Sequence, residues 1–307
     1  MPTPPDLPSR YEHRAQLGAG GMGAVWKVFD RERGEEVALK TFAPAEGVDV
    51  AEARFLFKQE FWAMASLGHP HLVAAYDYGE TSDGTPYFTM ALVPGHDLGT
   101  DLPRPEAEVR AWLPGVLAAL GHLHAHGWLH GDLKPENVRL GDDGRATLMD
   151  LGLLRRQGEA AGPVRGTLAY LAPEAIRQGP LDGRADLYAL GAVLFHALTG
   201  RPPFEQADTL GLLRAHLDAT PPAARTLAPE LSPAFDAALR RLLAKDPAAR
   251  FPDVAALGEA LELEVALEAS QGLLAAPLVG RDEALATLRA AALQPAGEAW
   301  AVTGEPG

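Results

Sequence analysis

One short stretch of the chain concentrates side chains that could do chemistry. Residues 130–137 read His-Gly-Asp-Leu-Lys-Pro-Glu-Asn, and an Asp-Leu-Gly triplet begins at Asp150, thirteen residues after Asn137. Transfer of a phosphoryl group needs a carboxylate to accept a hydroxyl proton, as Asp132 could, and oxygen ligands for Mg²⁺, as Asn137 and Asp150 could. An acidic loop followed by an unrelated turn would need several coincidences at once. We therefore predict a phosphoryl-transfer site.

A glycine set lies near the N-terminus, where Gly18, Gly20 and Gly23 form a GxGxxG pattern followed by Val25. Glycines allow backbone amides to approach phosphates because no Cβ stands in the way. A strand pattern follows these glycines, whereas a dinucleotide-binding fold would need a helix there. Taken alone, the set would be explained better by a plain glycine hairpin, so it supports a phosphate loop only together with the other motifs.

A lysine ends the next predicted strand, Val37-Ala38-Leu39-Lys40. An amine on a strand that faces a phosphate loop can pair with ATP phosphates, and it needs a carboxylate to hold it in place. Glu60, on the helix predicted next, is the best-placed candidate. Alone, Lys40 would more often be a solvated charge at a strand end.

The elements that must position these residues follow from hydrophobic periodicity and turn signals. Strands are predicted at 11–17, 24–30, 36–42, 72–78 and 87–93, and helices at 50–67, 105–126, 182–199, 206–217, 233–244 and 253–268. The predicted 50–67 helix includes Phe55, Ala63 and Leu67 among its apolar positions. A strand-rich first third followed by helices indicates two lobes of an α+β protein.

Composition limits the classes of partner and the cellular location that we expect. The net charge is −14, which argues against nucleic acid or an anionic membrane as partner and is compatible with basic substrates. There is no cysteine, no signal peptide pattern at residues 1–10 and no apolar run long enough to span a membrane. We therefore expect a cytoplasmic location.

Taken together, these motifs resemble the eukaryotic-type (Hanks-type) serine/threonine protein kinases of bacteria, over roughly residues 11–268. The resemblance implies a two-lobed kinase fold, with an N-lobe at 11–95 and a C-lobe at 96–268 after a disordered extension at 1–10. It also implies ATP and Mg²⁺, with Mn²⁺ as an alternative metal, and protein substrates. The Asp132-to-Asn137 segment is similar to the serine/threonine version of the motif.

The resemblance assigns the nucleotide to the N-terminal positions. Gly18, Gly20, Gly23 and Val25 would cover ATP, Val25 and Ala38 would sandwich the adenine, Met90 would be the gatekeeper, Ala91 to Val93 the hinge, and Asp97 would lie near the ribose. Lys40 and Glu60 would form the ion pair of the active state.

The resemblance assigns catalysis to the later motifs. Asp132 would be the catalytic base, Lys134 would steady the transferred phosphate, Thr167 would contact both, and Asn137 and Asp150 would hold the metal. Ala172-Pro173-Glu174 would close the activation segment (residues 150–174), with Glu174 paired to Arg250. Asp186 would brace the catalytic loop, residues 130–137.

Two departures from the family pattern concern regulation. Gly131 stands where many members have the arginine that binds a phosphorylated activation loop, and residues 153–166 contain no Ser, Thr or Tyr. The phosphate acceptor and its receptor are missing together. Our hypothesis is that activation-loop phosphorylation does not switch this chain on. Separately, Leu151 replaces the usual phenylalanine of the magnesium motif, and we expect its packing to survive.

The last part of the chain has a different character. We expect a linker and then, from residue 278, a pattern resembling the opening of AAA/STAND-like NTPase domains, with 299–307 similar to a strand entering a phosphate loop. The hypothesis is that 269–307 begin such a domain and that the chain is a fragment of a longer protein. A chance match in a disordered tail is the alternative.

Two further interpretations stay open beside an active kinase, and one histidine cluster needs an explanation. An ATP-binding pseudokinase or regulatory module is opposed by the presence of Lys40, Asp132, Asn137 and Asp150. A small-molecule phosphotransferase is opposed by the 166–174 segment, which shapes a peptide shelf in protein kinases. The histidines at 122, 124 and 126 alternate near a helix end, which is poor geometry for one metal-binding face, so surface and packing roles are expected.

Overall fold

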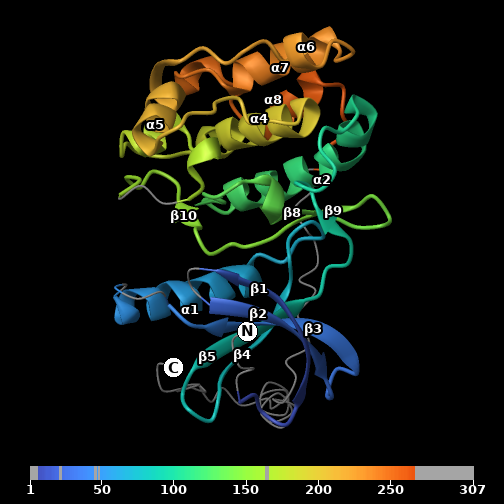
Figure 1. Cartoon of the computed structure of the whole chain (residues 1–307), viewed down its shortest axis with the longest axis vertical. Helices are drawn as coiled ribbons and strands as arrows, with labels where there is room; N and C mark the ends of the chain where they lie inside the picture. The colour runs from blue at the N-terminus through green and yellow to red at the C-terminus, as the bar shows by residue number, and fades with distance from the viewer. Residues whose placement is uncertain (1–5, 21–22, 45–46, 48, 163–165, 267–307) are drawn as a thin grey trace, which may run out of the picture. The chain divides into compact units, whose positions relative to one another are not determined.

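The computed structural model describes residues 6–20, 23–44, 47, 49–162 and 166–266. Figure 1 shows the strands from the first third of the chain, with the helix that follows Asp49, at one end of this part, and the later helices at the other. The two-lobed α+β arrangement predicted from the sequence is confirmed. The expected NTPase-like segment at 269–307 lies outside the described residues.

The strands near the N-terminus form one antiparallel sheet in the order β1-β2-β3-β5-β4. They are β1 (Tyr11–Gly20), β2 (Gly23–Asp30), β3 (Glu35–Phe42), β4 (Ala75–Glu80) and β5 (Pro86–Ala91). The register sets Val25 opposite Lys40 and Ala38 opposite Met90. Directly opposed residues, and alternate residues along a strand, share a face of a sheet. The register therefore brings these four side chains to the same face.

Helix α1 (Val50–Ser66) begins at Asp49, whose side chain accepts hydrogen bonds from the amides of Ala51 and Glu52. Its buried face runs through Ala53, Phe57, Glu60, Phe61 and Met64 at helical spacing. Phe55 was expected among the apolar positions, but it is 65% exposed. The reason is rotation: two residues before Phe57 corresponds to about 200° around the helix, which is the opposite side.

The remaining helices correspond to the predicted ones: α2 (Glu106–Ala125), α4 (Gly183–Thr199), α5 (Thr209–Asp218), α7 (Pro233–Leu242) and α8 (Val254–Ala260). The last is shorter than the predicted 253–268. The chain reverses because Glu262 adopts a φ of 53° and the amide of Leu263 donates 2.9 Å back to the carbonyl of Gly258.

Short elements connect these helices and carry much of the site. They are β6 (His96–Asp97), β7 (Trp128–Leu129), η1 (Pro135–Asn137), β8 (Val138–Leu140), β9 (Ala146–Leu148), β10 (Arg155–Arg156), η2 (Leu168–Tyr170), α3 (Pro173–Ile176), α6 (Ala224–Leu227) and η3 (Pro247–Ala249). They pair as β6-β8-β9 and β10-β7. None was predicted as an element, because two- and three-residue pieces carry no periodicity.

The start of the described chain lies against the sheet. Arg10 donates to both carboxylate oxygens of Asp30 at 2.8 and 2.6 Å and to Asp77 at 2.8 Å. This part of the extension that was expected to be disordered is therefore anchored by an ion-pair network. Separately, within the described residues no helix combines the length and apolar character needed to span a membrane.

Candidate active site

A cavity of about 730 Å³ collects most of the predicted site residues. It is lined by Gly18, Gly23, Val25, Ala38, Lys40, Met90, Ala91 and Val93 from the sheet side, by Glu60 of α1, and by Asp132, Lys134, Asn137 and Asp150. This volume lies within the range of small-molecule sites. Of the other predicted residues that the structure describes in full, Asp97 and Thr167 do not line the cavity.

Lys40 is fixed at the cavity wall by carboxylates. Its Nζ lies 2.7 and 2.9 Å from the two carboxylate oxygens of Glu60 and 3.5 Å from Oδ1 of Asp150. Burial alone would lower the pKa of Lys40, but Glu60 and Asp150 raise it above its ordinary value. Lys40 therefore presents a permanent, positioned cation to the cavity.

Asp150 has an unusual backbone and a low proton affinity. Its φ is 52°, in the left-handed region that Asp tolerates better than most residues. Burial would raise the pKa of Asp150, but Lys40 and His130 outweigh this effect and hold it below its ordinary value. The carboxylate is therefore ionised and able to bind a cation.

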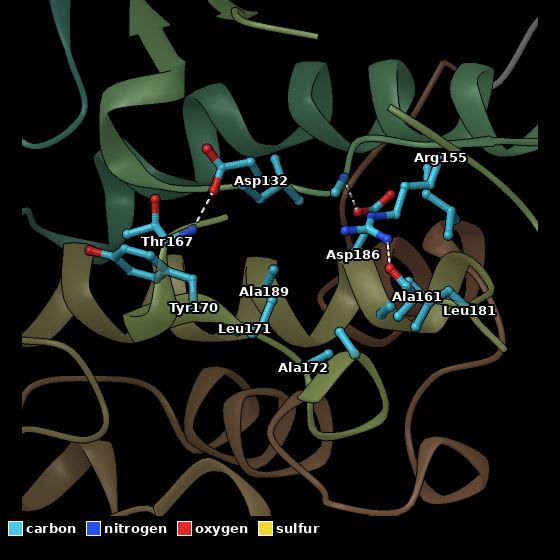
Figure 2. A pocket seen from close by; sticks show the side chains of 15 residues that line it. Asp132, Arg155, Ala161, Thr167, Tyr170, Leu171, Ala172, Leu181, Asp186 and Ala189 are labelled. Carbon is cyan, nitrogen blue, oxygen red and sulfur yellow. Dashed lines mark hydrogen bonds between the residues drawn. The ribbon is translucent and has the colours of Figure 1, made fainter. Parts of the chain in front are cut away.

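Asp132 is held from three sides. Its Oδ1 accepts 2.7 Å from the amide of Thr167, and its Oδ2 lies 3.1 Å from Nζ of Lys134. The side chain of Asn137 donates 2.9 Å to its backbone carbonyl. Figure 2 shows the bond from Thr167. Lys134 and Thr167 thus meet at Asp132, although Thr167 makes its contact through the backbone rather than its hydroxyl.

The polar groups suit a metal that is shared with phosphate. Among the residues that the structure describes, no three His, Asp or Glu side chains are placed to hold a metal ion by themselves. Asn137 and Asp150 supply two oxygen ligands on one cavity wall. Mg²⁺ usually binds one or two protein oxygens together with phosphate oxygens and water. The residues therefore fit Mg²⁺ as a companion of a nucleotide.

Gly23 is required by its surroundings. Its φ is 152°, and a Cβ there would lie 1.7 Å from the carbonyl oxygen of Thr41. No other residue type fits without moving the β2-β3 ladder. At this position the glycine pattern reflects a close approach of two backbones, while the expected approach to phosphate remains a prediction.

Asp186 connects helix α4 to the catalytic loop. It is 2% exposed and accepts from the amides of His130 at 2.9 Å and Gly131 at 3.0 Å, and it lies 2.8 Å from Nε2 of His124. The expected brace is present. His124 was not predicted as part of it, because alternating histidines give no signal of which one turns inward.

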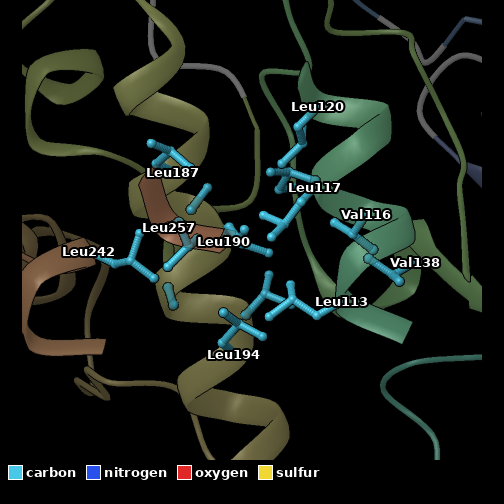
Figure 3. Packing of buried hydrophobic residues seen from close by; sticks show 14 of the residues in the cluster. Leu113, Val116, Leu117, Leu120, Val138, Leu187, Leu190, Leu194, Leu242 and Leu257 are labelled. Carbon is cyan, nitrogen blue, oxygen red and sulfur yellow. The ribbon is translucent and has the colours of Figure 1, made fainter. Parts of the chain in front are cut away.

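The helix that carries Asp186 is anchored by a leucine-rich core. Figure 3 shows α2 and α4 packed face to face. The contacts involve Leu113, Leu117 and Leu120 of α2, Leu187, Leu190 and Leu194 of α4, Leu242 of α7 and Leu257 of α8. All are at most 1% exposed. Each such burial contributes roughly 1.5–3 kcal/mol, so the helix that holds the catalytic loop is itself anchored in the apolar core.

Other site features were harder to foresee. Arg139 lines the cavity and donates to the carbonyls of Val93 at 2.7 Å and Gly95 at 2.5 Å. These bonds fix the segment that is expected to hydrogen-bond the adenine. No sequence signal pointed to Arg139. Leu151 is 1% exposed and packs in the cluster around Phe57, as expected for a substitute of phenylalanine.

Comparison with known proteins agrees with this geometry. Residues 11–260 match the protein kinase domain family. The serine/threonine-protein kinase PknL of Mycobacterium tuberculosis is 36% identical over 267 residues, covering 83% of this chain and 66% of PknL. PknF of the same species is 38% identical over 251 residues, covering 77% and 52%. A probable serine/threonine-protein kinase of Streptomyces coelicolor is 36% identical over 266 residues, covering 82% and 39%.

The chain thus spans two thirds or less of the length of these curated relatives. The match extends from the first strand of the sheet to the end of α8. The matched range includes every residue that is found to line the cavity of about 730 Å³. The chain belongs to the protein kinase family.

Proposed function

We propose that this chain transfers the γ-phosphoryl group of ATP to serine or threonine hydroxyls of proteins. The observation that carries the proposal is the meeting of Lys40, Asp132, Asn137 and Asp150 around one cavity large enough for a nucleotide. The relatives, each named a serine/threonine-protein kinase, support the choice of acceptor.

In this mechanism the chain mainly positions groups and neutralises charge. Lys40, oriented by Glu60, binds the α- and β-phosphates. Asp132 would orient the acceptor hydroxyl and take its proton, and Lys134 would steady the transferred phosphoryl group. Asn137 and Asp150 would hold Mg²⁺, which neutralises phosphate charge when bound. Mn²⁺ is the alternative ion, and a metal titration of the activity distinguishes the two.

The adenine would lie between Val25 and Ala38, with Met90 behind it and Ala91 to Val93 along its hydrogen-bonding edge. Support comes from the sheet register, which sets the side chains of Val25, Ala38 and Met90 on one face. Gly20 and Asp97 are assigned by resemblance alone, with Asp97 near the ribose. In the structure Asp97 accepts a 3.2 Å hydrogen bond from Thr100.

The deciding experiment is a radiolabelled ATP assay with a generic protein substrate, comparing wild type with Asp132→Asn. Loss of the proton acceptor should lower the rate by roughly 10²- to 10⁴-fold, while ATP binding measured by calorimetry stays close to wild type. Equal transfer by both proteins would contradict the assignment. ATP binding without transfer in the wild type would favour the pseudokinase alternative.

We further propose that phosphorylation of the activation loop does not control the activity, because residues 153–166 contain no hydroxyl side chain. Phosphatase treatment should leave the rate unchanged. A phosphate on Thr167 or Tyr170 that proves essential, detected by mass spectrometry of active protein, would contradict this proposal.

Two expectations remain predictions. The resemblance of residues 278–307 to an NTPase opening is supported by their sequence alone, and reading the gene beyond residue 307 tests it. The expected cytoplasmic location would be tested by fractionation of cells that express the protein.

A further inference from the structure

The catalytic loop contains one position where a side chain does not fit. Gly131 has a φ of 78°, and a Cβ there would lie 2.4 Å from the carbonyl oxygen of Leu153. The left-handed backbone favours glycine, and the carbonyl occupies the place that a side chain would need. An arginine at this position would therefore require a different path for the activation segment.

The side chain of Arg155 lies beside this gap. Strand β10 pairs with β7 so that Arg155 stands opposite Leu129, two residues before Gly131. Its Cγ lies 3.8 Å from the place of a Cβ on Gly131. Arg155, Gly131 and Asp186 all line a small cavity of about 40 Å³, and Figure 2 shows the guanidinium next to Asp186 and directed at Ala161. The guanidinium thus lies beside Gly131 of the catalytic loop, on the side of the small cavity.

Arg155 joins two parts of the activation segment. Its Nη1 donates a hydrogen bond to the carbonyl oxygen of Ala161. Ala161 is 3% exposed, and its amide donates 2.9 Å to the carbonyl of Gly179. The amide of Gly158 likewise donates 2.8 Å to Leu181. The arginine therefore links the first strand of the segment to a stretch that is paired with the chain beyond α3.

We propose that Arg155 is a positioning residue that fixes the shape of the activation segment beside the catalytic loop by binding the backbone carbonyl of Ala161. This inference rests on the proposed kinase function and deepens it. A backbone carbonyl is always present as a hydrogen-bond acceptor, so this link forms without phosphorylation of the activation segment. Arg155 lines the small cavity and not the nucleotide cavity, so it acts through the segment and not on ATP.

The test compares Arg155→Ala and Arg155→Lys with Arg156→Ala. Arg156 is the matched control: it is the exposed neighbour in β10, and its guanidinium carbon lies 3.9 Å above the ring of Trp128. We expect Arg155→Ala to lower kcat/KM for a protein substrate roughly 10- to 100-fold, the range for losing a hydrogen bond to a charged group. The KM for ATP should stay unchanged. Arg155→Lys should recover part of the loss, because an ammonium can donate to the same carbonyl.

A second readout does not depend on turnover. Amide hydrogen exchange at residues 158–162 should rise in Arg155→Ala and stay at the wild-type level in Arg156→Ala. The inference is overturned if the two alanine variants behave alike in both measurements. It is also overturned if Arg155→Ala loses ATP affinity and thermal stability in step with activity, since that indicates a general structural role. An inactive wild type would refute the proposed function, while the exchange data would still decide whether Arg155 holds the segment.

Discussion

Two buried ion pairs, one in each lobe, show how the same interaction serves different ends. Lys40 meets Glu60 at 2.7 and 2.9 Å, and Arg250 meets Glu174 at 2.6 and 2.8 Å. The side chain of Arg250 is 0% exposed, and it also donates 2.8 Å to the carbonyls of Arg184 and Ala244. The side chain of Lys40 is 14% exposed and lines the cavity of about 730 Å³.

The difference lies in unused hydrogen-bonding capacity. The donors of Arg250 are directed at protein oxygens, so its pair with Glu174 closes a structural contact between α3 and η3. Lys40 has three donors: it meets the two oxygens of Glu60 at 2.7 and 2.9 Å, and only a looser contact of 3.5 Å to Asp150 competes with a ligand for the third donor. We infer that the Arg250 pair serves stability and that the Lys40 pair serves binding. The predictions below would break or sharpen this contrast.

The largest effect is expected at the structural pair. Glu174→Gln leaves the buried guanidinium of Arg250 without its counter-charge, which should cost about 3–5 kcal/mol of unfolding free energy. Thermal denaturation should show a fall in Tm of roughly 10 °C for a domain of this size. As a control, Glu80→Gln removes an exposed pair with Arg54, whose Nη1 lies 3.1 Å away. Its cost should be at most about 1 kcal/mol, so similar costs for both variants would remove the basis of the contrast.

A smaller loss of stability but a clear loss of activity is expected at the cavity pair. Glu60→Gln keeps the shape of the side chain while it removes the charge that orients Lys40. Misplacement of a phosphate-binding group should lower kcat/KM roughly 100-fold, with a rise in the KM for ATP, because Asp150 only partly replaces Glu60. Steady-state kinetics and denaturation on the same samples measure both effects. If Glu60→Gln lost stability as strongly as Glu174→Gln while its kinetics stayed normal, the two pairs would have the same role.

The smallest effect is expected on the pH dependence of stability, through a histidine that follows the C-terminal end of α1. His69, in the loop after this helix, faces His71, His122 and Arg145. Burial and these neighbours lower the pKa of His69 to about 4. The unfolded chain takes up this proton near pH 6.5, so stability should be complete above that pH and fall between pH 6.5 and about 4.

Because His69 is only half-buried, we expect a loss of about 1 kcal/mol over this interval. Urea unfolding at both pH values measures it. His69→Gln should flatten the dependence, whereas the exposed His13→Gln should not. An unchanged slope in His69→Gln would show that the acid sensitivity arises elsewhere. A sensitivity that is confined to His69 would place it in the loop that follows the helix carrying Glu60.

The sequence-based predictions succeeded where a feature depends on residues close together in the chain, and they failed where it depends on contacts between distant segments. Strands, long helices and the residues of 130–137 are specified by neighbours in the chain, and their positions were predictable to within a few residues. The face of α1 was partly misjudged at Phe55, because only packing against the sheet decides which side is covered. The early end of α8 was missed, because it depends on a backbone reversal at Glu262 that no apolar pattern announces.

The sequence by itself determined the family, the two-lobed fold and the identity of the chemical groups, because these depend on residue types at fixed spacings. Only the tertiary structure decided which histidine supports Asp186, that Arg139 fixes the segment expected to hold the base, and that Gly131 faces the carbonyl of Leu153. It also decided where Arg155 points. These are contacts between segments that approach each other only in the folded chain, where close packing leaves room for one arrangement.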